Sequence, residues 1–311
     1  MILPKVAVIM STYNGADYIE AQLDSIFNQK NAEVALYIRD DKSTDNTVNI
    51  VREYANNHPE NIISIVTAGK DGNLGVYESW IKLLDYVPRV FEWYAISDQD
   101  DIWCPNKLEK AIAALTGINK PAIWSSNTVA VDEDLQPIKE YDFTRRMQSV
   151  QSLFIRFSIP AHVMVFNQQL LNCLDRFNGI DGIQSFTLEP RLLVTCLCLG
   201  GTWVKDRESL VMWRRIPGKN VTTAGSGIAK RFRKECELFW EKDIRTTWAK
   251  AVITAFNKEE LDENAYRFLN TVLRLDRNIA NRISLITSKS FTSGNALLDF
   301  RSKLRVLFPR W

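Results

Sequence analysis

The chain has few of the residues that build zinc sites and disulfide frameworks. It contains only two histidines, His58 and His162, and five cysteines without any paired Cys-x-x-Cys spacing. Structural zinc sites draw on such cysteine pairs or on several histidines, so a zinc site and a histidine-rich metal site are excluded. The cysteines stand among apolar neighbours, which favours reduced thiols in a core over disulfides.

Long apolar runs and glycine-rich phosphate-binding motifs are also missing. The longest strongly apolar stretch, residues 192–199, is too short to cross a bilayer. No Gly-x-Gly-x-x-Gly follows the first predicted strand and no P-loop motif occurs, which argues against a dinucleotide-binding fold and a P-loop enzyme. The N-terminus enters an apolar strand without a basic leader, so we predict no signal peptide and expect a cytoplasmic location.

Charge is unevenly distributed along the 311 residues. Residues 1–226 hold 22 Lys and Arg against 27 Asp and Glu, whereas residues 227–311 hold 17 against 10, so the balance changes from −5 to +7. A basic C-terminal region suits an anionic partner such as a membrane surface, or it forms a solvated helical face. Residues 297–311 mix cations with apolar side chains in a pattern that suits an interfacial helix or an ordinary packing helix.

What the chain does contain is a regular alternation of strand and helix patterns. Apolar runs predict strands at residues 5–10, 35–39, 62–67 and 94–97, and helical periodicity follows at 16–28, 46–54, 76–86 and 106–115. Four such units in a row predict a parallel sheet flanked by helices. Beyond them we predict a strand or hairpin at 122–131, a strand at 163–167, helices at 147–157, 168–177 and 188–199, and a hairpin formed by 202–206 and 209–213.

Polar loops follow each of the first four strands. They comprise residues 12–15, 40–45, 72–75 and 98–101, and in a parallel sheet they should meet at one edge. Ser43 or Asp45 is expected to cap the second helix. Residues 98–101 hold three carboxylates, which repel one another unless a cation or a polar ligand joins them. The alternative is a solvated acidic turn that caps the next helix.

Four motifs, in order and spacing, resemble the family 2 glycosyltransferases with the GT-A fold over residues 4–225. They are Val6-Ala7-Val8-Ile9-Met10-Ser11-Thr12-Tyr13-Asn14-Gly15, Asp40-Asp41-Lys42-Ser43-Thr44-Asp45, Asn73-Leu74-Gly75 and Ser97-Asp98-Gln99-Asp100-Asp101-Ile102-Trp103. The last is most similar to rhamnosyltransferase-like members that build bacterial surface polysaccharides. The resemblance implies an α/β, Rossmann-like, mostly parallel sheet flanked by helices. It also implies a GT-A domain at 1–226, with a nucleotide-binding half at 1–118 and an acceptor half at 119–226, before a basic helical region at 227–311.

The resemblance further implies an inverting transfer from a UDP- or dTDP-sugar to a hydroxyl of a growing, lipid-linked polysaccharide such as an O-antigen or capsule. Tyr13 would lie near the base, Asp41 would accept its N–H, and Asp100 would bind Mn²⁺ or Mg²⁺ at the diphosphate. Glu189 matches the family's catalytic base at the start of a helix, and Asp181 is the reserve candidate. The other implied donor-binding residues are Thr12, Asn14, Ser43, Asn73, Gly75, Asp98, Gln99 and Asp101, and Trp103 would face the acceptor.

The chain departs from the family pattern in its second half. Relatives often carry a histidine shortly after a pair that resembles Trp213-Arg214, and residues 215–219 have none. Arg214, Arg215 or Lys219 would then meet the diphosphate charge, or metal binding is weak, or activity is lost. His162 beside an apolar strand is expected to be structural.

Two other classes of function remain open at this point. One is a catalytically silent, nucleotide-sugar-binding scaffold in a polysaccharide synthesis complex. The other is a nucleotidyltransferase, although the first loop lacks the glycines and cations that such enzymes usually carry. No nucleic-acid partner is expected, and the basic C-terminal region could bring the chain to the inner face of the plasma membrane.

Overall fold

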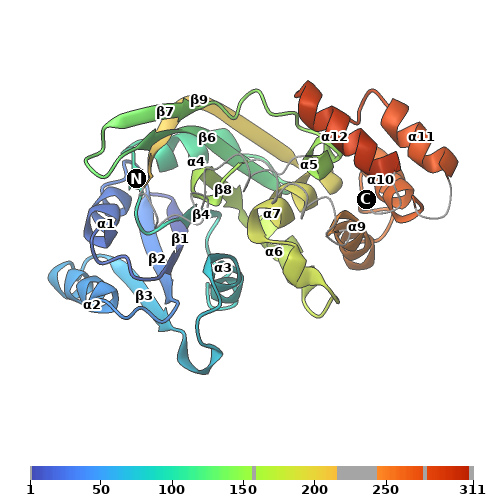
Figure 1. The fold of residues 1–311 in the computed structure, drawn as a ribbon. Coiled ribbons are helices and arrows are strands. Elements are labelled where there is room, and N and C mark those ends of the chain that lie inside the picture. Colours follow the sequence, from blue (N-terminus) through green and yellow to red (C-terminus); the bar gives the residue numbers. More distant parts are fainter. Residues whose placement is uncertain (1, 156–158, 216–243, 276–278, 308–311) are drawn as a thin grey trace.

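Nine described strands form one curled sheet with helices on its faces (Figure 1). The computed structural model describes residues 2–155, 159–215, 244–275 and 279–307. The strand order is β3-β2-β1-β4-β8-β6-β9-β5, and β7 pairs with β6. In this order, β3, β2, β1 and β4 of the first half lie next to one another, and the strands of the second half continue the sheet from β4.

The first half is the predicted parallel sheet. Its strands are β1 (Lys5–Thr12), β2 (Glu33–Asp40), β3 (Ile62–Thr67) and β4 (Trp93–Ser97), and its helices are α1 (Ile19–Phe27), α2 (Thr47–Asn57), α3 (Val76–Leu84) and α4 (Lys107–Leu115). β1 lies between β2 and β4 and is buried over nearly its whole length, as its continuous apolar run predicts. Thr12 pairs with Asp40, and Met10 pairs with Ser97. The carboxyl ends of these three strands therefore lie together.

The second half joins the sheet through an antiparallel strand. β8 (Met164–Asn167) runs antiparallel to both β4 and β6 (Ala122–Val131), and β9 (Thr202–Arg214) runs parallel to β6. β6 and β9 consequently point in the same direction as the first four strands, and the sheet is mostly parallel. The short strands β5 (Ile102–Trp103) and β7 (Pro137–Tyr141) are antiparallel to β9 and β6.

The hairpin predicted from residues 202–213 is wrong, because this segment is the single strand β9. Its pairing with β6 is irregular: Ser125 pairs with Lys205, but Asn127 pairs with Ser209. Residues 206–208 stand opposite Ser126 alone and form a polar bulge that resembles a turn in sequence. Asp206 and Glu208 of this bulge lie within ion-pair distance of Lys110.

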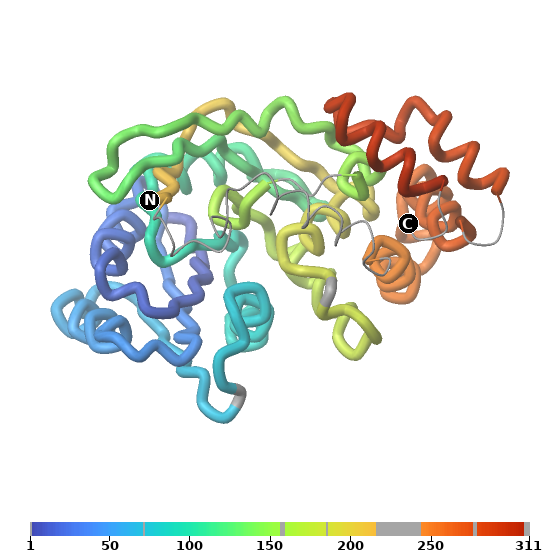
Figure 2. The backbone as a smooth tube through the Cα atoms, in the orientation of Figure 1, coloured from blue at the N-terminus to red at the C-terminus, as the bar shows by residue number. Residues whose placement is uncertain are grey.

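The remaining helices cover the second half and extend the molecule at one end. They are α5 (Val150–Ile155), α6 (Gln168–Leu174), α7 (Leu188–Cys198), α9 (Ile244–Ala255), α10 (Glu263–Leu273), α11 (Ile279–Thr287) and α12 (Ala296–Leu307). Short 3₁₀ segments occur at Gly69–Asp71, Ala161–Val163, Asp175–Phe177 and Ile183–Ser185. Figure 2 shows α9–α12, in orange and red, at the end away from α1 and α2.

The C-terminal helices share the core of the sheet domain. Trp248 of α9 stacks on Phe186 with ring centroids 4.7 Å apart, and Phe268 of α10 packs edge-on against Phe154 at 5.1 Å. No described helix is long and apolar enough to cross a membrane. The predicted boundary at residue 226 falls outside the described residues. The four described cysteines are free, and of these Cys196 and Cys198 are buried while Cys104 and Cys173 are partly exposed.

Candidate active site

A cavity of about 340 Å³ opens where the strand-end loops of the first half face the second half. It is lined by Ser11, Tyr13, Asp41, Asn73, Gly75, Val76, Tyr77, Trp80, Asp98, Gln99, Asp100, Pro160, Ala161, His162, Glu189 and Trp213. The four polar loops predicted to converge contribute seven of these sixteen residues. The rest comes from Ser11 of β1, from α3 and from the segments before β8, at the start of α7 and at the end of β9.

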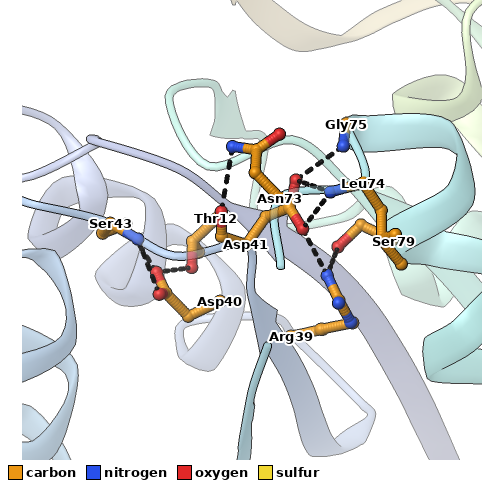
Figure 3. Close-up of polar contacts among 9 residues, drawn as sticks. All are labelled: Thr12, Arg39, Asp40, Asp41, Ser43, Asn73, Leu74, Gly75 and Ser79. Atoms are coloured by element: carbon orange, nitrogen blue, oxygen red, sulfur yellow. Dashed lines mark hydrogen bonds and ion pairs between the residues drawn. The ribbon is translucent and has the colours of Figure 1, made fainter. Parts of the chain in front are cut away.

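Asp40 ties the first loop to the second (Figure 3). It accepts hydrogen bonds from the Thr12 hydroxyl (2.9 Å) and from the backbone N–H of Ser43 (2.9 Å). The backbone N–H of Asn14 in turn donates to the Ser43 hydroxyl (3.0 Å). Thr12, Asn14 and Ser43, which the resemblance assigned to donor binding, are absent from the cavity lining, and in the structure they hold its loops.

Asp41 fixes the third loop against the end of β2 (Figure 3). Its buried carboxylate is ion-paired with Arg39 and accepts the backbone N–H groups of Leu74 (2.9 Å) and Gly75 (2.7 Å), while its carbonyl accepts from the Asn73 side chain (3.0 Å). Gly75 has a φ of 78°, which favours glycine. The carboxylate accepts hydrogen bonds from three donors and has about four acceptor positions, so about one position is left for a nucleobase N–H.

Gln99 clamps the acidic loop to the first loop. Its Oε1 accepts the backbone N–H of Tyr13 (2.8 Å), and its Nε2 donates to the Tyr13 carbonyl (2.9 Å). Gly15 makes the clamp possible, since a Cβ there would lie 2.4 Å from the Gln99 Oε1. The Tyr13 side chain remains 48% exposed at the cavity, where a planar ring is available for stacking.

His162 lies between two acids of the acidic loop. Its Nδ1 is 3.0 Å from Oδ2 of Asp98 and 3.4 Å from Oδ2 of Asp101, and the three ligand atoms lie within 4.8 Å of one another. Asp101 is completely buried, and its Oδ2 has no hydrogen-bond partner among the described residues. Burial and the nearby carboxylates of Asp98 and Asp100 raise the pKa of Asp101 well above its usual value. Two oxygens and a nitrogen in this arrangement form a donor set that fits a divalent cation.

A buried lysine, Lys107, is hydrogen-bonded to the backbone of the same histidine. The Lys107 Nζ donates to the His162 carbonyl (2.7 Å) and lies 3.3 Å from the centroid of the Trp103 ring. Burial lowers the pKa of Lys107 well below its usual value, although Asp101 and Asp98 oppose this effect. Trp103, assigned to the acceptor side by resemblance, is only 2% exposed and is absent from the cavity lining. Its position is that of a packing residue under the acidic loop.

Glu189 faces the cavity from the first turn of α7. Its Oε2 is buried and has no hydrogen-bond partner among the described residues. Burial, with a smaller contribution from the negative charge of Asp98, raises the pKa of Glu189 to about 7. Arg191, two residues later, donates to the carbonyls of Phe186 and Ile183 at 2.9 Å and so anchors the start of this helix. Such a carboxylate can accept a proton near neutral pH.

The other predicted charged residues lie outside the lining. Asp181 is exposed in the loop before α7. Arg214 is buried behind the acidic loop, where its Nε donates to the Asp100 carbonyl (3.0 Å) and its backbone N–H donates to Asp101 (3.2 Å). Lys219 lies outside the described residues. Arg214 thus supports the loop that carries Asp100.

Several cavity residues were missing from the sequence-based set. Tyr77 and Trp80 follow Gly75 on α3, Trp213 ends β9, and His162 precedes β8. Proximity to the Asn73-Leu74-Gly75 motif could have suggested Tyr77, but the other positions depend on tertiary contacts. Of the two predicted cap residues, Asp45 accepts the backbone N–H of Thr47 (3.0 Å) at the start of α2.

Comparison with known proteins gives consistent matches. The model of "Glycosyl transferase family 2" matches residues 7–176. The chain is 38% identical over 270 residues to dTDP-rhamnosyl transferase RfbG of Shigella flexneri, which corresponds to 85% of this chain and 88% of that protein. Over 110 residues, 35% of this chain and 40% of the other, it is 32% identical to UDP-Glc:alpha-D-GlcNAc-diphosphoundecaprenol beta-1,3-glucosyltransferase WfgD of Escherichia coli.

Among solved structures, residues 1–349 of S. aureus TarS in complex with UDP-GlcNAc have a similar fold. The TM-score is 0.56 at 18% sequence identity, and the match covers 92% of this chain and 77% of that chain. At this identity the likeness concerns the fold, including the region of the C-terminal helices.

Proposed function

The chain belongs to glycosyltransferase family 2 and is a glycosyltransferase with the GT-A fold, and from this premise we propose its substrates and mechanism. It transfers a sugar from a UDP- or dTDP-sugar, with inversion at the anomeric carbon, to a hydroxyl of a growing bacterial surface polysaccharide. The observation that carries the proposal is the Glu189 carboxylate, whose buried Oε2 has no hydrogen-bond partner among the described residues and which shares one cavity with the acidic loop. An inverting transfer needs such a base on the acceptor side and charged groups on the donor side.

The donor would occupy the first-half side of the cavity. Tyr13 offers its ring to the base, and Asn73 and Gly75 border the sugar-phosphate, while the Gln99 clamp holds these loops in place. RfbG is named for a dTDP-rhamnosyl donor and WfgD for a UDP-Glc donor, so the relatives support a pyrimidine nucleotide of either kind. The name of WfgD also supports a lipid diphosphate-linked acceptor.

Glu189 would act as the base. Its carboxylate takes the proton of the acceptor hydroxyl while that oxygen attacks the anomeric carbon from the face opposite the nucleotide. With a pKa of about 7, the carboxylate is ionised in a useful fraction at neutral pH and still holds the proton well. Asp181, exposed outside the cavity, is the weaker candidate.

The acidic loop would hold a divalent cation, Mn²⁺ or Mg²⁺. We assign Asp100, which lines the cavity, as one ligand, and Asp98 and Asp101 with His162 as the inner donor set. The cation would neutralise charge on the departing nucleoside diphosphate. The protein's own part is to pin the loop, and Arg214 does so through its hydrogen bonds to the Asp100 carbonyl and the Asp101 carboxylate. The diphosphate contacts expected of Lys219 stay a prediction.

The division of labour along the chain is also part of the proposal. Residues 1–118 would bind the nucleotide, and residues 119–226 would bind the acceptor. Residues 227–311 would contact the membrane that holds the acceptor. A lipid-linked acceptor requires the enzyme to work at a membrane, so we propose a cytoplasmic protein that associates peripherally with the inner face of the plasma membrane.

The test is a donor screen that measures nucleotide release, coupled to calorimetric titration of UDP and dTDP with and without Mn²⁺. We expect one pyrimidine nucleotide to bind more tightly with Mn²⁺, and its sugar conjugates to turn over. Asp100→Asn should abolish turnover, whereas Asp134→Asn, on an exposed turn, should leave it unchanged. Absence of binding by both nucleotides would sink the proposal, and turnover would eliminate the silent-scaffold alternative.

A further inference from the structure

One face of α12 leaves a row of large apolar side chains in solvent. Leu297 and Phe300 are each 61% exposed, Leu307 is 40% exposed, and Leu304 is partly exposed. At 3.6 residues per turn, these positions lie on one side of the helix. We refer to these four residues as the α12 stripe. Its length of three turns distinguishes it from the scattered single apolar residues that ordinary protein surfaces carry.

Cations flank the α12 stripe on both sides. By the same helical spacing, Arg301 and Arg305 lie along one edge and Lys303 along the other. The side opposite the stripe faces the protein, where Ser302 and Val306 are buried. An exposed apolar stripe bordered by Lys and Arg has the charge and polarity of a helix that lies in a membrane interface.

The single acid of α12 is engaged elsewhere. Asp299 accepts hydrogen bonds from the backbone N–H (2.6 Å) and hydroxyl (2.7 Å) of Ser293 and from the Thr292 hydroxyl. These bonds hold the pKa of Asp299 below its usual value, and the carboxylate lies at the start of the helix, where the helix dipole favours it. Within α12, three cations thus stand against one acid, and Asp299 lies near one end of the stripe, where the charge of Lys303 also contributes to its lowered pKa.

The neighbouring helix enlarges the apolar area. Ile279 and Ile283, one turn apart on α11, are both exposed. Figure 1 shows α11 and α12 side by side at the outer end of the molecule, away from α1 and α2. Arg282 of α11 donates to the Leu307 carbonyl (3.2 Å) and so links the two helices. The pair forms a surface at the margin of the fold, where a flat partner can approach.

We propose that the α12 stripe is a membrane-docking surface that inserts into the interface of an anionic bilayer. The leucines and Phe300 enter the acyl boundary while Arg301, Lys303 and Arg305 contact acidic headgroups. Charge complementarity selects this occupant, because a second copy of the chain would bring the same cations together. The inference deepens the proposed function and rests on it for its purpose, since a lipid-linked acceptor requires the cavity to work near a bilayer.

The test is flotation of the full-length protein with phosphatidylcholine vesicles and with vesicles that contain about one third phosphatidylglycerol. We expect flotation with the anionic vesicles alone, and at least a tenfold decrease in 0.5 M salt, because exposed charges are then screened. Phe300→Glu should reduce the bound fraction at least tenfold. The matched control is Ile138→Glu, an equally exposed apolar position on β7, which should bind as the wild type does.

Two outcomes would overturn the docking surface. One is flotation of Phe300→Glu at the wild-type level, and the other is a wild-type dimer that this substitution converts to a monomer in light scattering. Nucleotide affinity, measured by calorimetry on the same variants, should not change. If the wild type binds nucleotide but does not float with the vesicles, the docking surface is rejected and the proposed function stands. If the wild type binds neither UDP nor dTDP, the proposed function is rejected.

Discussion

Glu189 combines a buried carboxylate oxygen that lacks a hydrogen-bond partner with a pKa of about 7 against an ordinary value of 4.5. Because the folded-state pKa is the higher one, the stabilising contribution of the protonated group is complete below about pH 4.5 and decreases as pH rises to 7. Glu189→Gln cannot ionise. Its melting temperature should therefore exceed that of the wild type by an amount that grows between these pH values and is constant above them.

The same substitution should remove the base. We expect kcat to fall by about 10²- to 10⁴-fold, a typical contribution of general base catalysis. Asp181→Asn should change neither kcat nor the melting temperature. Equal melting temperatures of wild type and Glu189→Gln at pH 4.5 and pH 8 would contradict the burial argument, whatever the activity.

The pH dependence of kcat/KM in the wild type tests the protonation state of Glu189 independently. Burial and the charge of Asp98 raise its pKa, and Tyr77 of α3 is the other titratable group that senses it across the cavity. We expect kcat/KM to rise with pH and level off above about pH 7, since the ionised carboxylate is the active form. A rate that falls through this range in the wild type would assign the opposite protonation state.

His162 gives a prediction about the metal. If its Nδ1 joins Asp98 and Asp101 as a ligand, bound Mn²⁺ should show nitrogen coupling from an imidazole in pulsed electron paramagnetic resonance. The chain makes the assignment simple, because the only other histidine, His58, lies on the surface with its Nδ1 3.3 Å from Glu60. His58→Gln should keep the coupling and His162→Gln should remove it. Bound Mn²⁺ without nitrogen coupling would leave His162 as a hydrogen-bond partner of the acids.

The elements of the first half could be predicted because each unit is local. The apolar run of β1, the polar loop after it and the periodicity of α1 are adjacent in sequence, and parallel pairing then brings the loops to one edge. β9 could not be predicted in the same way. Its bulge at residues 206–208 is as polar as a turn, and only pairing with β6 distinguishes the two.

At the site, sequence identified the side chains near a motif and missed those brought in by tertiary contacts. Tyr13, Asp98 and Gln99 belong to recognisable loops, whereas Trp213 reaches the cavity from the end of a strand that was predicted as a hairpin. The buried state of Trp103 was equally hidden, because it arises from tertiary contacts such as the pairing of β5 with β9 and the approach of Lys107 to the ring. Motif spacing reports which residues are near a ligand, but not which way a buried side chain points.

The clamp between the first and fourth loops can be tested as a unit. Gly15→Ala would push a methyl group into the Gln99 amide and break its two hydrogen bonds to Tyr13, while Gln99→Ala would remove the same bonds directly. Each substitution should weaken nucleotide binding about tenfold by loosening the Tyr13 loop. The double variant should be no weaker than either single one, because the clash disappears with the amide. Additive losses, measured by calorimetry, would refute this coupling.

On the scale of the whole molecule, the cavity joins the two halves of the sheet. Asp41 and Gly75 come from the first half, and Glu189, His162 and Trp213 from the second, so a ligand that fills the cavity contacts both. The acidic body and basic end of the chain also fit the proposed plan, in which a cation-binding loop and a membrane-docking helix lie apart. The charge distribution along the sequence suggested a basic C-terminal region, whereas the register of the α12 stripe required the structure.

A ligand that bridges both halves should stabilise the fold as a whole. A pyrimidine nucleoside diphosphate at about 100 times its dissociation constant adds about 2.7 kcal/mol to the free energy of unfolding. In a chain of this size that corresponds to roughly 5 °C in melting temperature. UDP or dTDP with Mn²⁺ should produce this shift, and chelation of Mn²⁺ or Asp100→Asn should remove the metal-dependent part of it. GDP at the same concentration is the control, because the proposed pyrimidine donor rests on the names of RfbG and WfgD. An equal shift with GDP would mean that the nucleotide binds through its phosphates alone and that Tyr13 and Asp41 do not read the base.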